Sequence, residues 1–222
     1  MTAPTLTPRF NWARALGDWL ARPHEFANLI KSPAQDAFTP QHGEWMKIFL
    51  KAKRLELLQA FRNSYKTTCG LDAVILIFLL KPETRLLIAR KTDTLAAQLV
   101  LAIQKLFESN AVLRLWLNAR YGTPDVKTKE WSQERTVFSF KKQVTVQPSI
   151  TAAGVSSSLT GAHFDLIWCD DIVTRADRLS GAERFMTQSF FRECFNLLEP
   201  NGSLILTGTP WHEQDLFSTL VE

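Results

Sequence analysis

The segment from Phe164 to Cys169 is apolar except for Asp165, and it runs directly into two adjacent carboxylates, Asp170 and Asp171. A short apolar run of this kind is typical of a strand that is buried on both faces of a sheet. A second such run, Leu55 to Ala60, lies upstream and leads into the polar stretch 61–68. Both patterns predict buried strands that carry polar groups at their carboxyl ends.

Strand and helix patterns alternate along the chain. We expect strands at 55–60, 85–89, 149–153, 164–170 and 203–206, short strands at 136–140 and 144–146, and helices at 10–31, 44–53, from the polar loop to Leu80, at 94–107 and at 181–198. Pro33, Pro40 and Gly43 should break the chain, and Pro200–Gly202 should turn it. Residues 110–135 show no clear pattern. The alternation predicts an α/β fold with a mostly parallel central sheet flanked by helices, and with ligands at the carboxyl ends of the strands.

The composition is that of a globular protein, because 45% of the residues are hydrophobic and 22% are charged. The start of the chain lacks the pattern of a signal peptide, and the apolar run from Ala73 to Leu80 is too short to span a bilayer. The three cysteines have no pairing or metal spacing, which favours buried free thiols. We therefore expect a soluble intracellular protein that is not secreted and does not associate with a membrane.

The charge is distributed unevenly. Residues 1–150 hold 22 lysines and arginines against 12 acids, a balance of +10, whereas residues 151–222 hold 4 against 10, a balance of −6. A basic surface suits a polyanionic partner, although a solvated basic face without a partner has the same composition. The densest basic stretch comprises Lys127, Lys129, Arg135, Lys141 and Lys142.

The polar loop after the first strand fits a phosphate-binding pattern in part. The standard pattern is G-x-x-x-x-G-K-[ST], in which the glycines let backbone amides curl around phosphate oxygens. Residues 60–67 fit this register with Ala60 and Tyr65 in place of the two glycines, and they keep Lys66 and Thr67. We expect Lys66 to reach the terminal phosphates and Thr67 to coordinate Mg²⁺. Arg62 either contacts the transferred phosphate or lies on the surface.

The paired acids complement this loop. A phosphoryl-transfer site needs one carboxylate for Mg²⁺ and a second group that orients the attacking water. Adjacent residues at a strand end can serve both needs, because the turning chain aims them in different directions. We assign the metal role to Asp170 and the water role to Asp171. The alternative is that the two acids only cap the following turn.

Four stretches together resemble the ATPase domain of a tailed-phage terminase large subunit, the motor that packages DNA into preformed capsids. Residues 62–67 resemble the variant Walker A motif of the family, and residues 160–171 resemble its Walker B motif with the usual lead-in. Thr207-Gly208-Thr209 resembles the coupling motif, and residues 211–216 resemble the Trp-His-x-x-Asp-Leu run that follows it. The similarity covers roughly residues 38–222, and the last two stretches are its most distinctive part.

The resemblance implies a P-loop NTPase of the additional-strand type that hydrolyses ATP with Mg²⁺ to move double-stranded DNA. It implies a homo-oligomeric ring in the host cytoplasm, with the portal protein and the small terminase subunit as partners. It assigns catalysis to Asp171, Arg62 and Lys66, metal binding to Thr67 and Asp170, and coupling to Thr207, Gly208 and Thr209. The candidate ATP-binding residues are Gln41, Arg62, Asn63, Ser64, Tyr65, Lys66, Thr67 and Thr68.

The resemblance also sets the expected domain organisation. We expect one ATPase domain over residues 1–222, in which 1–43 form a helical extension and 44–222 form the core, without the nuclease domain that the family carries. Two other functions remain open. One is a different nucleic-acid translocase or helicase with the same core. The other is a DNA- or partner-binding module whose altered loop no longer holds nucleotide.

Overall fold

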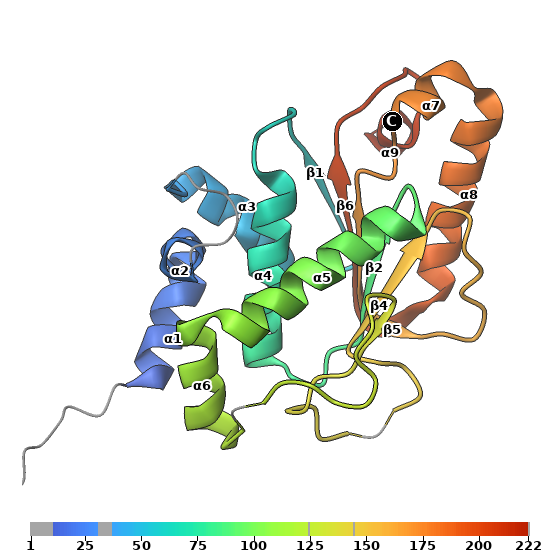
Figure 1. Cartoon of the computed structure of the whole chain (residues 1–222). Helices are drawn as coiled ribbons and strands as arrows, with labels where there is room; N and C mark the ends of the chain where they lie inside the picture. The colour runs from blue at the N-terminus through green and yellow to red at the C-terminus, as the bar shows by residue number, and fades with distance from the viewer. Residues whose placement is uncertain (1–10, 31–36, 124, 144, 222) are drawn as a thin grey trace, which may run out of the picture.

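The computed structural model describes residues 11–30, 37–123, 125–143 and 145–221. A six-stranded sheet forms the centre of the molecule, with helices on both of its faces (Figure 1). The strand order is β1-β6-β5-β2-β4-β3, and every pairing is parallel except that of β3 with β4. The expected α/β fold with a mostly parallel sheet is therefore confirmed.

The elements have the following bounds. The strands are β1 Leu55–Gln59, β2 Leu86–Arg90, β3 Arg135–Thr136, β4 Ile150–Gly154, β5 Phe164–Asp170 and β6 Leu198–Gly208. The helices are α1 Trp12–Ala21, α2 Pro23–Ile30, α3 Pro40–Leu50, α4 Lys66–Leu80, α5 Asp93–Ser109, α6 Ala111–Tyr121, α7 Arg175–Leu179, α8 Gly181–Asn196 and α9 Leu216–Val221.

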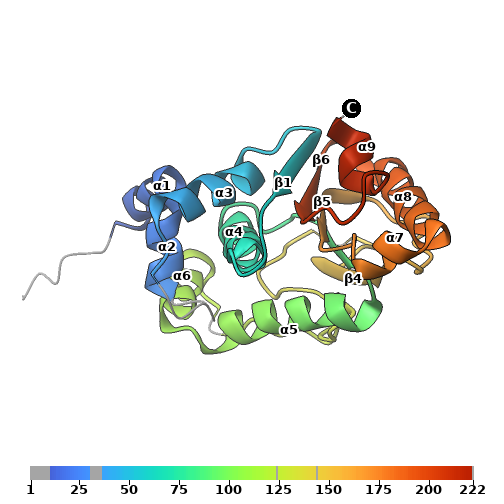
Figure 2. The same ribbon diagram turned by 90° about the horizontal axis from the view of Figure 1, so that it is seen from above.

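The sheet separates two apolar cores. Figure 2 shows it between α4 and α5 on one side and α7, α8 and α9 on the other. Alternate residues of the central strands face opposite cores, because side-chain direction alternates along a strand. In β5, for example, Trp168 packs against the α1–α6 side, and Ile167 and Cys169 pack against the α7–α9 side. This two-sided burial explains why the sequence of β5 is a nearly continuous apolar run.

The position of β6 brings the polar strand ends together. It lies between β1 and β5, where Gly208 pairs with Gln59 and Thr207 pairs with Asp170. Since all three strands are parallel, their carboxyl ends lie at the same edge of the sheet. The loops that follow β1, β5 and β6 therefore meet at one place.

The N-terminal region differs from the sequence prediction. The helix expected over 10–31 is divided at Pro23, which begins α2, so the described part forms two helices. Pro40 does not break the chain but occupies the first turn of α3, where its missing N–H costs nothing. Gly43 lies inside α3, at a position where a β-carbon would meet Nδ1 of His24 at 2.6 Å. Pro33 lies outside the described residues.

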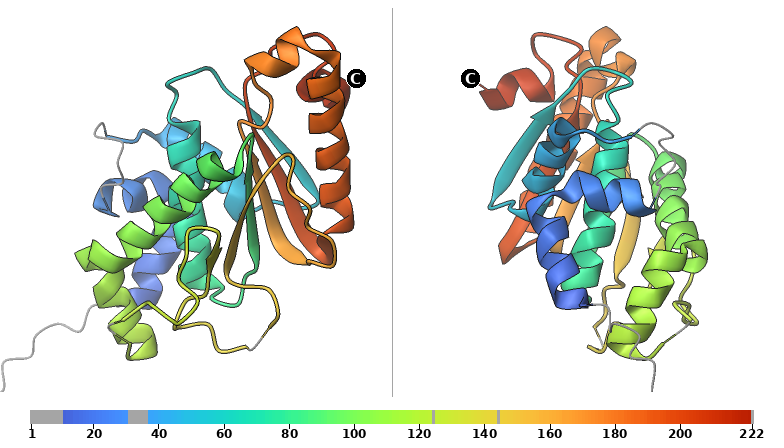
Figure 3. Two further views of the ribbon diagram at one scale, coloured as in Figure 1. Left: turned by 45° about the vertical axis from the view of Figure 1, so that its right-hand side comes forward. Right: turned by 90° about the vertical axis from the view of Figure 1, so that its left-hand side faces the viewer.

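The expected boundary between residues 43 and 44 falls within α3. Residues of α1 and α2, including Trp19 and Phe26, are buried in the same core as α4. Figure 3 shows these helices packed against the α4 side of the sheet. The described part of the N-terminal region is therefore continuous with the sheet-containing core.

Three other predictions were wrong. Of the strand expected at 136–140, only Thr136 lies in a strand, β3, because Phe138 and Phe140 instead fill the core beside Phe107. Residues 145–146 are not in a strand, and residue 144 lies outside the described residues. The turn at Pro200–Gly202 is an irregular part of the longer β6, where the pairing with β5 shifts between Phe164 and Leu166. Helix α6, in a region without a sequence assignment, was missed.

The apolar run of α4 is explained by burial. All residues from Cys69 to Leu79 are buried. The interpretation of Ala73–Leu80 as a core helix is confirmed up to Leu79, whereas Leu80 is half-buried. Among the described residues, no helix combines the length and apolarity needed to cross a bilayer. The three cysteines are buried free thiols, as expected.

The packing of α4 gives a stability prediction. A β-carbon on Gly70 would lie 2.4 Å from Cζ2 of Trp168 and 2.8 Å from Cζ of Phe49, both of which are buried rings. Gly70→Ala should lower the free energy of unfolding by about 1–3 kcal/mol, as measured by urea denaturation. Gly17→Ala in α1 is the matched control, because its β-carbon meets nothing within 4 Å. Equal stability of Gly70→Ala and the wild type would contradict this packing.

Candidate functional site

The loop between β1 and α4 turns without glycine. Asn63 and Tyr65 both have a φ of 60°, in the left-handed region that glycine favours. Tyr65 occupies the place of the second motif glycine, and its ring lies near those of Phe38 and His42, at 6.0 and 6.1 Å between centroids. These contacts help to offset the cost of a left-handed non-glycine residue, which is about 1–2 kcal/mol. The loop thus keeps a tight turn despite the substitutions.

Lys66 and Asp171 face the same pocket. Lys66 begins α4, its side chain is 8% exposed, and its Nζ lies 3.5 Å from Oδ1 of Asp171. The pocket has a volume of about 440 Å³, and its lining comprises Arg62, Asn63, Ser64, Tyr65, Lys66, Thr67 and Asp171. Two segments that are far apart in the sequence therefore meet around one cavity, as the motifs predicted.

Asp170 is completely buried and is not among the residues that line this pocket. The hydroxyl of Thr67 donates to its Oδ2 at 3.0 Å, and the hydroxyl of Thr207 donates to its Oδ1 at 2.7 Å. Thr207 in turn accepts a hydrogen bond from Nε1 of Trp168 at 2.9 Å. The two residues assigned to metal binding, Thr67 and Asp170, are thus in direct contact.

Arg90 is a residue of this site that sequence reasoning missed. It ends β2, next to β5 in the sheet, and its Nε lies 3.2 Å from Oδ2 of Asp170. Its Nη2 lies 3.8 Å from Oδ2 of Asp171. The signal was present in the sequence, because Arg90 is a polar residue at the end of an apolar strand, as Asp170 is. Among the described residues, Arg90 and Lys66 are the cations that form ion pairs with Asp170 and Asp171.

The electrostatics of Asp170 follow from its burial. Loss of hydration raises the pKa of the Asp170 carboxyl to about 6, against the positive charge of Arg90, which lowers it. The neighbouring charge of Asp171 adds to the rise, and the hydroxyls of Thr207 and Thr67 favour the ionised form. The buried carboxylate therefore depends on a nearby cation.

Thr207, Gly208 and Thr209, which the sequence predicts as coupling residues, contact the other parts of the site. Thr207 contacts Asp170, and the hydroxyl of Thr209 donates to the carbonyl of Ala60 at 2.8 Å. Gly208 accepts from the backbone N–H of Ala60 at 3.0 Å. A β-carbon on Gly208 would lie 3.4 Å from Oδ1 of Asp171 and 2.9 Å from the ring of Phe217. The end of β6 thus touches both the loop and the acid pair.

Arg62 lines the pocket, but its guanidinium stacks on a ring. Its Cζ lies 4.3 Å from the centroid of the Trp211 ring, a cation–π contact. The side chain is therefore held beside the run that follows β6, at the lining of the pocket.

The run from Trp211 to Leu216 is organised by Asp215. This buried carboxylate accepts hydrogen bonds from the backbone N–H groups of Trp211, His212 and Ser218. It thereby satisfies donors at the start of α9, which agrees with its interpretation as a residue that favours the first helical turn. Nδ1 of His212 accepts a hydrogen bond from the backbone N–H of Gln214, which is a local structural contact.

The remaining candidates divide into two groups. Ser64 and Asn63 line the pocket, whereas Gln41 is exposed in the first turn of α3 and does not line it. Its neighbour His42, which the sequence reasoning did not single out, lies against the loop instead. Thr68, the third residue of α4, is half-buried and does not line the pocket either.

The donors present suit a magnesium-bound phosphate group. The buried hydroxyl of Ser64 has no hydrogen-bond partner in the described part of the chain, so a pocket ligand could supply one. Mg²⁺ is usually held by one or two carboxylates together with substrate phosphates. Thr67 and Asp170 provide such a small set, and the described residues hold no group of three or more His, Cys, Asp or Glu side chains that could bind a metal. The chemistry of the site therefore fits both Mg²⁺ and a phosphate group.

Comparison of the sequence with models of known protein families finds no match. A comparison with curated proteins also finds none.

Proposed function

We propose that this chain is a magnesium-dependent ATPase of the additional-strand P-loop class, and that it acts as the DNA-packaging motor domain of a tailed-phage terminase large subunit. The convergence of two motif segments carries the proposal. Lys66 lies 3.5 Å from Asp171, and Thr67 donates to Asp170. The resemblance of residues 207–216 to the coupling region of that family supports the narrower assignment.

The strand order supports the assignment to the additional-strand class of P-loop proteins. The additional-strand type has a strand inserted between the phosphate-loop strand and the acid-tipped strand. In this chain β6 lies between β1 and β5 and carries Thr207 at the shared edge. The inserted strand is therefore in contact with both motifs.

The residues have complementary roles in the proposed reaction. Lys66 neutralises negative charge on the terminal phosphates, and Asp171 orients the attacking water and accepts its proton. Thr67 and Asp170 would hold Mg²⁺, whose charge stabilises the developing negative charge on the phosphates. Thr207 contacts Asp170 and Thr209 contacts Ala60, and these contacts couple the nucleotide-bound state of the pocket to the position of β6.

The basic stretch offers a smaller DNA surface than the sequence indicated. Lys127 pairs with Glu108 and Arg135 pairs with Glu130, while Lys141 donates to Thr145 and Gln147. Lys129 and Lys142 are exposed. DNA affinity through this stretch should therefore show a modest salt dependence, since each neutralised phosphate adds about 0.9 to the slope of log affinity against log salt.

Two measurements on the purified chain test the proposal. Calorimetric titration with ATP and Mg²⁺ should show binding, and phosphate release should rise faster than linearly with protein concentration if neighbouring subunits complete the site. Binding and turnover that both fail at millimolar nucleotide would instead support the non-hydrolysing module. Strand separation by the protein would favour the helicase alternative.

Replacement of Lys66 should weaken nucleotide binding. Lys66→Met retains the apolar stem but removes the ammonium, and a hydrogen bond to a charged group contributes about 1.5–3 kcal/mol. The affinity for ATP in the presence of Mg²⁺ should fall by about 10- to 150-fold, as measured by calorimetry. Lys105→Met on the exposed side of α5 is the matched control. An unchanged affinity for ATP in Lys66→Met would show that Lys66 does not contribute to nucleotide binding.

A further inference from the structure

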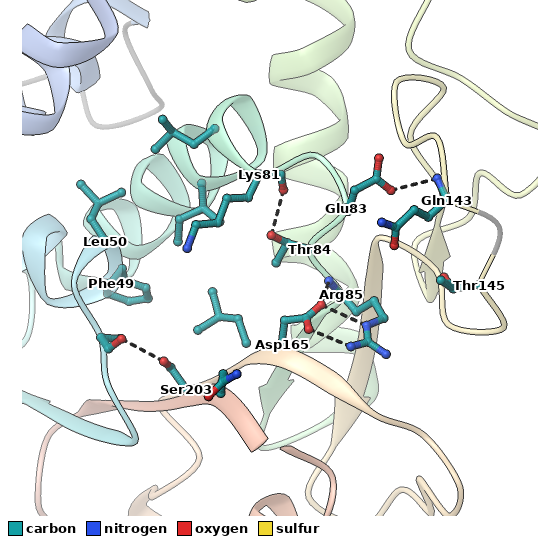
Figure 4. A pocket seen from close by; sticks show the side chains of 15 residues that line it. Phe49, Leu50, Lys81, Glu83, Thr84, Arg85, Gln143, Thr145, Asp165 and Ser203 are labelled. Atoms are coloured by element: carbon teal, nitrogen blue, oxygen red, sulfur yellow. Dashed lines mark hydrogen bonds and ion pairs between the residues drawn. The ribbon is translucent and has the colours of Figure 1, made fainter. Parts of the chain in front are cut away.

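A second pocket lies at the opposite edge of the sheet from the candidate site. It has a volume of about 540 Å³ and lies where α3 and α4 end and β5 begins, beside residues 81–85 (Figure 4). Its size is within the range of about 300–1,000 Å³ that small-molecule sites occupy. No step of the proposed reaction uses it.

The pocket is separated from the candidate site by the length of α4. Lys66 begins this helix at the site, and Leu80 ends it at the pocket. With a rise of 1.5 Å per residue, the 15 residues of α4 span about 22 Å. A ligand in this pocket would therefore not touch Asp170 or Asp171, and its binding can be measured whether or not the chain hydrolyses ATP.

One wall of the pocket is apolar. Phe49 from α3, Ile77 and Leu80 from α4 and Leu166 from β5 line it. Phe49, Ile77 and Leu166 are buried, and Leu80 is half-buried. Phe49 also packs edge-on against Trp168, at 5.3 Å between ring centroids, which fixes its ring. This wall offers a firm apolar surface to a flat or aliphatic ligand.

The other wall carries charges that are already compensated within the protein. Arg85 donates to both carboxylate oxygens of Asp165, at 2.7 and 3.0 Å, and lies 2.9 Å from Glu199. The Glu83 carboxylate accepts from the backbone N–H groups of Lys142 and Gln143. These groups shape the wall but have little capacity left for a charged ligand.

Lys81 is the exception among the charged residues that line the pocket. Figure 4 shows its side chain extending into the opening between the apolar wall and the pair formed by Arg85 and Asp165. Lys81 is exposed, and within the described ranges its ammonium makes no ion pair with an acidic side chain. An unpaired ammonium beside an apolar wall favours a ligand that carries one negative group on an apolar body.

We propose that this pocket binds a small amphipathic monoanion. The apolar body packs against Phe49, Ile77 and Leu166, and a carboxylate or sulfonate oxygen accepts hydrogen bonds from the Lys81 ammonium. Asn201, which also lines the pocket, supplies a neutral amide at the rim.

Two fluorescent probes that differ in one group test the proposal. The anion 8-anilinonaphthalene-1-sulfonate and the neutral N-phenyl-1-naphthylamine share their ring system, but only the first carries a sulfonate. Both should bind the folded chain, and the sulfonate should raise the melting temperature, because a ligand of the native state stabilises it. Failure of the sulfonate to bind at millimolar concentration, or a lowered melting temperature, would overturn the proposal.

Variants then assign the binding to this pocket. Lys81→Gln should weaken binding of the sulfonate by about tenfold, the effect of one charged hydrogen bond, and should leave the neutral probe within about twofold. Lys51→Gln, an exposed lysine just beyond α3, should change neither. Leu50→Trp, at a half-buried position that lines this pocket, should reduce binding of both probes by filling the cavity, and its folding is checked by circular dichroism. Unchanged sulfonate binding in Lys81→Gln, or in a folded Leu50→Trp, would contradict the assignment.

Discussion

Replacing Asp171 with Asn is expected to lower ATP turnover by about 10²- to 10⁴-fold, which is the usual contribution of a general base. The amide keeps the shape of the carboxylate but cannot accept a proton from water. Binding of ATP should stay within about threefold of the wild type, because Asp171 is assigned to the attacking water and not to the phosphates or to the metal. Turnover is measured by phosphate release and binding by calorimetry.

The separation between turnover and binding makes this test specific. A general loss of structure would lower both, and a residue that only caps the following turn would change neither. Asp18→Asn, on an exposed part of α1, is the control for the change in side-chain chemistry. Normal hydrolysis by Asp171→Asn would refute the water-orienting role and, with it, the mechanism proposed for this site.

Replacing Arg90 with Met is expected to lower the free energy of unfolding by about 3 kcal/mol. Removing one partner of a buried ion pair leaves the other charge uncompensated, which costs about 3–5 kcal/mol. Asp170 is completely buried and Arg90 is nearly so, with 17% of its side chain exposed. The lower end of that range applies because Thr67 and Thr207 still donate to the carboxylate. Urea denaturation measures the change.

A double replacement separates the ion pair from packing. If the cost of Arg90→Met comes from the isolated charge, Asp170→Asn should recover part of the lost stability in the Arg90→Met background. The non-additivity of the two changes should be about 0.5–3 kcal/mol. Arg192→Met, at an exposed position of α8, controls for the loss of an arginine side chain. Additive effects of Arg90→Met and Asp170→Asn would show that Arg90 acts through packing alone.

The fold was predictable where burial leaves a clear pattern. β5 and β1 were placed correctly to within one residue at each end, and α4 ends at Leu80 as predicted. Nearly all of β5 and most of α4 are buried, whereas in β1 only Leu58 is buried. The same reasoning failed for Phe138 and Phe140. Their alternation suggested a strand, but both rings turn into the core from an irregular segment. Apolar periodicity indicates which side chains are buried. It identifies the backbone conformation only when the segment forms regular secondary structure.

The motif residues of the candidate site could be predicted from the sequence, but the contacts around them could not. Lys66, Thr67, Asp170 and Asp171 are each marked by their place at the end of a strand or the start of a helix. The contact between Arg62 and Trp211 joins two loops, and no local pattern predicts it.

The sequence by itself determined that this chain forms an α/β sheet and that its polar groups follow the strand ends, because apolar runs and the charges that end them are local properties. Tertiary structure alone decided that β6 lies between β1 and β5, and that Arg90 from a third strand faces the acid pair. It also placed Lys81 beside the apolar wall of a pocket at the far edge of the sheet. These features depend on which strands become neighbours, and that choice follows from the packing of the whole chain, which no single segment encodes.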